Sequence, residues 1–135
     1  MRHLLNARSI SLVAVLFVAL SQCNVSIAKQ PQRIRFERGK SSAVVHGHIA
    51  GFDIQDYVVE ARAGQQMDIR VKASNPETYF VLYSINGRAT DMNETDHYSL
   101  ETTESGDYVI RVFMMRAAAR RKGAASDFTL TISIH

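Results

Sequence analysis

Asp107-Tyr-Val-Ile-Arg-Val-Phe-Met114 is the clearest β-strand in this sequence, and the chain enters it through the turn residues Ser105-Gly106. β-Branched and aromatic residues dominate the stretch, as they do in strands. Close to the end of the chain, residues 128–134 alternate strictly between apolar and polar side chains, which is typical of a strand with one buried face. These two segments favour an all-β fold.

Six earlier segments carry similar strand patterns and are separated by turn residues. We expect strands at residues 33–36, 42–49, 56–61, 67–71, 79–83 and 97–100. The continuous apolar run 79–83 predicts a strand buried on both faces or nearly so, and 97–100 predicts a short edge strand. Residues 115–121 are good helix formers ended by Gly123, so one short helical turn is expected.

Because the strands do not alternate with helices, the pattern predicts an antiparallel, immunoglobulin-like β-sandwich of about seven to eight strands. A small closed barrel is the second possibility. The strands all fall within residues 29–135, which have the usual size of one domain.

Residues 1–28 have the layout of a signal peptide: Arg2 and Arg8 without an acid, the apolar run 9–20, and the small residues Ser26 and Ala28 at a cleavage site. Cleavage after Ala28 would leave an exported mature domain, residues 29–135. The apolar run 9–20 is too short to span a bilayer, and no later segment is apolar enough to form a membrane span.

Cys23 leaves an alternative to cleavage after Ala28. Leu20-Ser21-Gln22-Cys23 resembles a lipobox, although Gln22 stands where such boxes have a small residue. If Cys23 is removed with the signal peptide, the mature domain has no cysteine, and its core must hold without disulfides.

The charge balance excludes a broadly basic protein. The chain has 16 Lys and Arg against 13 Asp and Glu, and without Arg2 and Arg8 this becomes 14 against 13, a net charge of +1. A role in binding nucleic acid therefore has little support. Charge is unevenly distributed along the chain, because residues 91–107 carry six acids without Lys or Arg, and residues 111–122 carry five Lys and Arg without an acid.

Candidate metal and catalytic groups are sparse. His46 and His48 point to one face of a strand and could share zinc with His97, His135 or a carboxylate, but no ligand spacing supports this, and two solvent-facing histidines are expected. Asp53 and Asp56 could bind calcium, although turn capping is far commoner.

Ser41 and Ser42 lie near His46, but no third group or oxyanion motif completes a triad. We expect no catalytic residue, no metal and no cofactor, and hence a protein that is not an enzyme.

Arg116-Ala-Ala-Ala-Arg120 is the most specific local motif. Spacing of i,i+4 places two guanidinium groups on one side of a helical turn, with Arg121 and Lys122 beside them. Guanidinium groups bind carboxylates in a bidentate manner, so this segment suits an acidic cleft on a partner protein.

Several motifs together resemble the periplasmic inhibitors of g-type (goose-type) lysozyme. They cover most of residues 29–135: Phe36-Glu-Arg-Gly39, Gly47-x-Ile49-x-Gly51-Phe52-Asp53, Tyr57, Ala61-x-Ala63-Gly64-Gln65, Gly106-x-Tyr108, Arg111-Val112 and Arg116-x-x-x-Arg120. Some of these motifs are also similar to pre-peptidase C-terminal domains and mark the β-sandwich rather than a function.

The resemblance to the inhibitor family implies a protein partner, g-type lysozyme, whose muramidase cleft would receive loops at one end of the sandwich. Two arginines and an aromatic residue would make the main contacts, here Arg116, Arg120 and Phe52, with Arg121 beside them. A member of the family carries tyrosine where Phe52 stands, so a hydroxyl contact is absent. The alternative is an envelope module that binds glycans through Phe52 or Tyr98.

Overall fold

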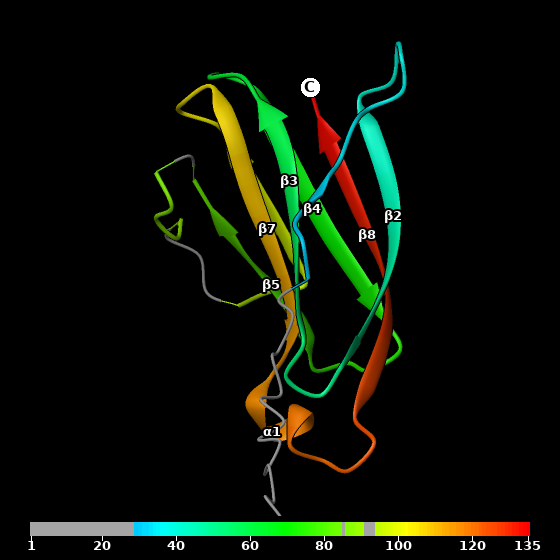
Figure 1. The fold of residues 1–135 in the computed structure, drawn as a ribbon. Coiled ribbons are helices and arrows are strands. Elements are labelled where there is room, and N and C mark those ends of the chain that lie inside the picture. The colour runs from blue at the N-terminus through cyan, green and yellow to red at the C-terminus, as the bar shows by residue number, and fades with distance from the viewer. Residues whose placement is uncertain (1–28, 85, 91–93) are drawn as a thin grey trace, which may run out of the picture.

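The computed structural model describes residues 29–84, 86–90 and 94–135, so the predicted signal peptide and Cys23 lie outside the described residues. It contains two sheets of four strands, with strand orders β1-β3-β7-β5 and β2-β8-β4-β6, and one short helix (Figure 1). The predicted β-sandwich is confirmed. The elements are β1 (Gln32–Arg33), β2 (Ser42–Ala50), β3 (Ile54–Ala61), β4 (Gln66–Ala73), β5 (Thr78–Tyr83), β6 (His97–Glu101), β7 (Gly106–Met114), α1 (Arg116–Ala119) and β8 (Ala125–Ile134).

The first strand is shorter than the sequence indicated, and its pairing differs from the rest. All other strand pairs are antiparallel, whereas β1 runs parallel to β3 over Gln32 and Arg33 alone. The predicted strand at 33–36 is therefore wrong in its bounds. After Ile34 donates its N–H to the carbonyl of Val58 at 2.8 Å, the chain leaves the sheet edge and turns towards β2.

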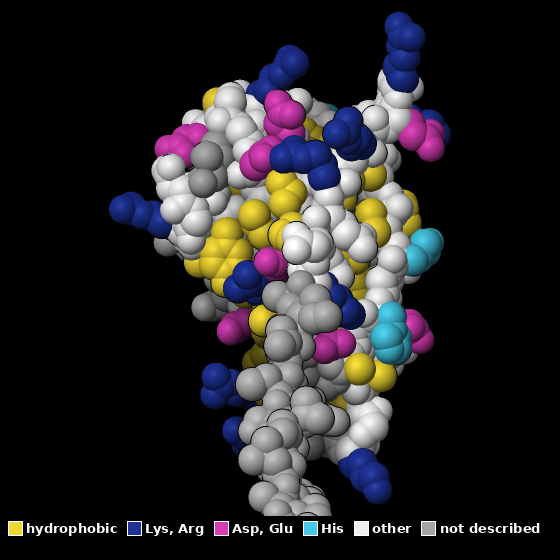
Figure 2. Space-filling model, viewed as in Figure 1, with side chains coloured by type: hydrophobic (Ala, Val, Ile, Leu, Met, Phe, Trp, Pro, Cys, Tyr) yellow, Lys and Arg dark blue, Asp and Glu magenta, His cyan; other side chains and the backbone are white. Residues whose placement is uncertain are grey.

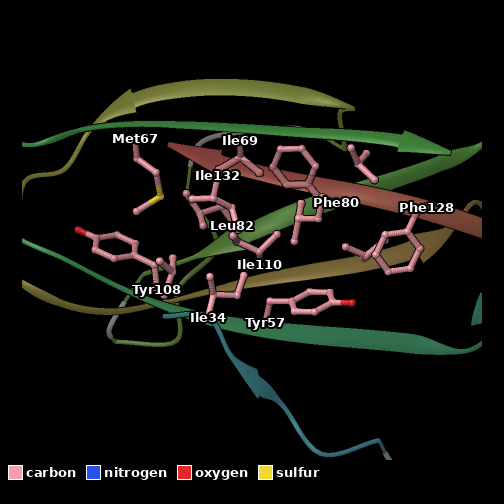
Figure 3. Close-up of a cluster of buried hydrophobic side chains, with 14 of the residues drawn as sticks. Ile34, Tyr57, Met67, Ile69, Phe80, Leu82, Tyr108, Ile110, Phe128 and Ile132 are labelled. Atoms are coloured by element: carbon pink, nitrogen blue, oxygen red, sulfur yellow. The ribbon is translucent and has the colours of Figure 1, made fainter. Parts of the chain in front are cut away.

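The core lies between the two sheets and is built from alternate residues of the central strands (Figure 3). Along β7, every second residue from Tyr108 to Met114 is buried. The same alternation runs along β8 from Ser126 to Ile134. Each strand thus gives one face to the core and the other to solvent, as a two-layer sandwich requires.

The strand β5 departs from its predicted burial. Phe80 and Leu82 are fully buried, but Tyr79, Val81 and Tyr83 are only partly covered. The outer face of this strand is less buried than predicted, because β5 lies at a sheet edge and each sheet of a sandwich has one inner face. The predicted edge strand β6 is confirmed, at the end of the second sheet.

Gly47 leaves space for two aromatic rings. It lies on the inward face of β2 opposite Phe128 of β8, and the ring of Phe128 meets Tyr57 edge to face, with centroids 6.2 Å apart. A Cβ atom on Gly47 would lie 2.3 Å from Cζ of Phe128 and 2.6 Å from Oη of Tyr57. Glycine is therefore required here by packing, since this position has no unusual backbone angle.

Three connections meet at one end of the sandwich, which we call the α1 end. They are the β2–β3 turn (residues 51–53), the β4–β5 turn (74–77) and the β7–β8 connection (115–124), which includes α1 (Figure 1). Backbone hydrogen bonds join them: Gly51 donates to Ala124 at 2.8 Å, and Met115 donates to Glu77 at 2.9 Å. Among the residues that the structure describes, no helix is long and apolar enough to cross a membrane.

Candidate functional site at the α1 end

The short helix α1 presents Arg116 and Arg120 to solvent. Backbone hydrogen bonds from Ala119 to Met115 (2.9 Å) and from Arg120 to Arg116 (3.1 Å) form the helical turn. Ala118 and Ala119 are buried against the sandwich, whereas both arginines are exposed. The small alanine side chains let the turn pack closely, and this fixes the backbone from which the two arginines project.

The arginines of this segment differ in their contacts. Within residues 29–84, 86–90 and 94–135, Arg116 and Arg120 form no ion pair, whereas Nη2 of Arg121 lies 3.3 Å from Oε1 of Glu77 in the β4–β5 turn. The side chain of Arg121 is 67% exposed, so this pair is weak. Two guanidinium groups are therefore available to a partner, and a third is already engaged by the protein itself.

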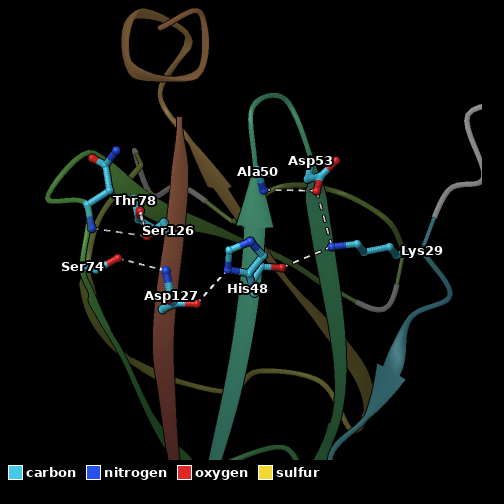
Figure 4. A network of polar contacts seen from close by, with 9 residues as sticks. Lys29, His48, Ala50, Asp53, Ser74, Thr78, Ser126 and Asp127 are labelled. Carbon is cyan, nitrogen blue, oxygen red and sulfur yellow. Dashed lines mark hydrogen bonds and ion pairs between the residues drawn. The ribbon is translucent and has the colours of Figure 1, made fainter. Parts of the chain in front are cut away.

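Phe52 lies at the tip of the β2–β3 turn and is 64% exposed. Gly51 has a φ angle of 55°, a conformation that glycine adopts at little cost. The carboxylate of Asp53 accepts a hydrogen bond from the N–H of Ala50 at 3.1 Å and holds the turn. Because Gly51 is bonded to Ala124, Phe52 shares the α1 end with the two arginines, and Figure 4 shows the turn beside the α1 connection.

Two further apolar side chains belong to this end and were not predicted from the sequence. Ile54 is 46% exposed and Met115 is 37% exposed, and both lie next to the connections that carry Phe52 and Arg116. Ile54 follows the turn directly, and Met115 immediately precedes α1. The exposure of Ile54 and Met115 depends on where strands β3 and β7 begin and end, and the local sequence pattern does not indicate those positions.

The histidines His46 and His48 are exposed on the outer face of β2, as expected. Nδ1 of His46 lies 3.1 Å from Oγ1 of Thr129. Nδ1 of His48 lies 2.7 Å from Oδ1 of Asp127, a contact drawn in Figure 4. His97 is bonded elsewhere, to Asp68. No three His, Cys, Asp or Glu side chains in the described part of the chain are close enough to hold a metal ion.

The two aspartates considered for calcium have structural roles instead. Asp53 caps the turn and lies 3.5 Å from Nζ of Lys29. Asp56 forms a bidentate ion pair with Arg111, with N···O distances of 2.8 and 2.9 Å. The carboxylate of Asp56 raises the pKa of Arg111 above its ordinary value, and the guanidinium group also lies 5.2 Å from the ring centroid of Tyr83.

The acidic and basic runs of the sequence are only partly separated from each other in the folded protein. The basic residues that follow Arg111 lie at the α1 end, and the β6–β7 turn with Glu104 lies at the opposite end. There, however, Arg33 forms a bidentate pair with Asp107, which lowers the pKa of that carboxyl group. One acid of the run is therefore neutralised by a base from another strand.

Comparisons with known proteins find similarity to inhibitors of g-type lysozyme. No protein-family model matches the chain. The inhibitor of g-type lysozyme from Escherichia coli (strain K12) is 29% identical over 127 residues, which cover 90% of this chain and 93% of that protein.

Solved structures agree with the sequence comparison. The periplasmic inhibitor of g-type lysozyme from Aeromonas hydrophila superposes with a TM-score of 0.71 at 28% identity, covering 78% of this chain and 96% of the other. The corresponding inhibitor from Salmonella Typhimurium gives a TM-score of 0.60 at 25% identity, covering 79% and 99%. The resemblance of this chain to the periplasmic inhibitors of g-type lysozyme is thus confirmed in both sequence and fold.

Proposed function

We propose that this protein is a periplasmic inhibitor of g-type lysozyme that places its α1 end in the muramidase cleft. The observation that carries this proposal is the similarity to such inhibitors over 90% of the chain, together with the shared fold. The α1 end adds a physical reason, because it combines exposed cationic and apolar side chains on a fixed backbone. The protein then acts by binding, without a catalytic step.

The two free arginines suit the chemistry of such a cleft. An enzyme that cleaves glycosidic bonds holds at least one carboxylic acid beside the scissile bond. Arg116 or Arg120 can bind this group through two parallel hydrogen bonds and so exclude the substrate. Opposite charges on the two proteins would also speed their encounter.

The apolar side chains would complete the interface. Phe52, Ile54 and Met115 are exposed in the free protein, so covering them by a partner removes apolar surface from water. Aromatic residues and arginines that are buried centrally dominate the energy of many protein interfaces. We expect Phe52, Arg116 and Arg120 to contribute most, and Arg121 to contribute less because Glu77 already binds it.

The exposure of Phe52 also supports the alternative of a glycan-binding envelope module, because an open aromatic ring can stack on a sugar. Tyr98, the second aromatic residue of this alternative, is half-buried against the core, which makes it less suitable. A pull-down on purified peptidoglycan separates the two functions. Retention without lysozyme would favour the module, and capture of lysozyme alone would favour the inhibitor.

Inhibition of cell-wall lysis tests the proposal directly. Residues 29–135 should lower the lysis rate of a g-type lysozyme, and Arg116→Ala with Arg120→Ala should weaken inhibition by at least about 30-fold, since losing one partner of a desolvated charge pair costs roughly 2–5 kcal/mol.

Arg70→Ala with Lys72→Ala is the matched control. It removes the same charge from two exposed side chains of β4, and inhibition should stay within about twofold of the parent. Unchanged lysis with the parent protein, or equal inhibition by the two double variants, would contradict the proposal.

A further inference from the structure

A hollow of about 730 Å³ opens at the end of the sandwich opposite α1, near the C-terminus that Figure 1 marks. The β1–β2 connection, the end of β3 and the β3–β4 turn line this hollow. The buried side chains of Ile34, Ala61 and Ile134 contribute its apolar lining. Arg35, Lys40 and Arg62 also line it, and all three are exposed.

The backbone holds these three basic residues in place. The N–H of Arg62 donates to Oε1 of Gln65 at 2.7 Å, and its carbonyl oxygen accepts from the N–H of Gln65 at 3.1 Å and from the hydroxyl of Thr102. Lys40 closes a turn by donating its N–H to Glu37 at 2.9 Å. Arg35 directly follows Ile34, which is bonded to β3. The positions from which the cations project are therefore fixed before any ligand arrives.

The lining of the hollow is rich in donors and poor in acceptors. Arg35 and Arg62 have no ion pair within the described residues, and Nζ of Lys40 lies 3.9 Å from Oε2 of Glu37, in a pair whose side chains are 64% and 81% exposed. Glu60 is the one acid among the residues that line the described hollow. Ser41 and Gln65 add neutral donors. Figure 2 shows several Lys and Arg side chains at this end of the molecule, with Asp and Glu side chains among them.

We propose that this hollow binds a small phosphorylated solute, with the phosphate group among Arg35, Lys40 and Arg62. A phosphate ester carries up to two negative charges and three strong acceptor oxygens, which match several cations better than one carboxylate does. Guanidinium groups bind phosphate in a bidentate manner, and lysine adds a point charge. The volume exceeds that of phosphate alone and leaves room for an organic part beside the apolar lining.

This site is distinct from the lysozyme-binding end in position and in residues. The hollow uses β1, β3 and the 62–65 turn, whereas Phe52, Arg116 and Arg120 lie at the other end of the same strands. The inference therefore does not depend on lysozyme inhibition.

Isothermal titration with pyrophosphate, in phosphate-free buffer at low ionic strength, tests the proposal on residues 29–135. We expect saturable one-to-one binding. Arg35→Gln with Arg62→Gln should weaken it by at least ~10-fold, because the variant loses two guanidinium groups that donate charge-assisted hydrogen bonds to the phosphate. Arg70→Gln with Lys72→Gln removes the same charge from the outer face of β4 and should change the affinity by about twofold or less.

Three results would overturn the proposal. The first is the absence of saturable heat at up to about 10 mM pyrophosphate, because binding weaker than this would not indicate a specific phosphate site. The second is equal loss of binding in the two double variants, which would indicate diffuse charge attraction. The third is co-sedimentation with phosphatidylglycerol vesicles through Arg35 and Arg62 without pyrophosphate binding, which would identify a membrane surface as the source of phosphate. Circular dichroism of each variant verifies that it is folded.

Discussion

Replacing Gly47 with alanine should destabilise the sandwich, although alanine is ordinarily the better residue within a strand. The new Cβ atom would lie 2.3 Å from Cζ of Phe128 and 2.6 Å from Oη of Tyr57. Phe128 is 3% exposed and Tyr57 is 1% exposed, so neither ring can move into solvent without disturbing the core.

The size of the effect follows from these distances. Non-bonded carbon atoms prefer separations of about 3.5–4.0 Å, so the ring of Phe128 must retreat by more than about 1 Å. Overpacking of this kind costs roughly 1–3 kcal/mol. Replacing glycine with alanine within a strand ordinarily stabilises the fold by about 0.5–1 kcal/mol. Three atoms of Phe128 and Tyr57 lie within 2.8 Å of the new carbon, so the cost should be in the upper part of that range, about 2–3 kcal/mol. The free energy of unfolding should therefore fall by about 1–2.5 kcal/mol, which lowers the melting temperature of a domain of this size by roughly 4–20 °C.

Urea unfolding followed by circular dichroism measures this change, and Phe128→Leu provides the decisive second variant. Leucine lacks Cζ and Cε2 of Phe128, two of the three atoms that the new methyl group would meet, so Gly47→Ala should cost clearly less in the Phe128→Leu background, where Oη of Tyr57 still lies close. The two changes should therefore be strongly non-additive. Additive effects, or a Gly47→Ala protein as stable as the parent, would refute the packing explanation for this glycine.

Three further predictions concern single side chains. Phe52→Tyr should strengthen inhibition of g-type lysozyme by about 3–10-fold, because a hydroxyl that finds a partner contributes roughly 0.5–1.5 kcal/mol, and equal inhibition by the two proteins would argue against a hydroxyl contact. Asp56→Ala should lower the free energy of unfolding by about 1–3 kcal/mol by stranding Arg111, whereas an unchanged urea midpoint would show that their ion pair contributes nothing. Burial raises the pKa of Tyr57 in the folded protein, so folding favours the neutral phenol. The resulting contribution to the free energy of unfolding is present below about pH 10 and should be lost as the pH rises through the folded-state pKa. In urea titrations at alkaline pH, Tyr57→Phe should reduce this loss.

The central strands were predictable from composition and periodicity. Residues 128–134 alternate in polarity with a period of two, and residues 107–114 are rich in β-branched and aromatic side chains. These segments form β8 and β7, which have a neighbour on each side. The edge strands were harder to predict. Two residues of β1 suffice for its pairing, and the outer face of β5 is apolar although no second layer covers it. In such strands local composition does not determine where pairing stops or how deeply a side chain is buried.

The candidate site was predictable where it depends on local spacing and unpredictable where it depends on register. The i,i+4 spacing of Arg116 and Arg120 sufficed to predict a shared helical turn, and a backbone hydrogen bond closes that turn. In contrast, Arg111 belongs to the same basic run but pairs with Asp56, because the β3–β7 register places these two residues opposite each other. No pattern within either strand contains that information.

The arginines therefore divide into those that stabilise the fold and those that remain available. Arg111 and Arg33 bind carboxylates of their own sheet, and Arg121 reaches Glu77. Moving such an arginine into a partner cleft would first break an internal pair, and the stranded carboxylate would reduce the gain in binding. Arg116 and Arg120 exchange only water for a partner carboxylate, since the described residues offer them no ion pair. If inhibition rests on this difference, Glu77→Gln should release Arg121 and strengthen inhibition in the lysis assay, whereas the same change should have no effect once Arg121 is alanine.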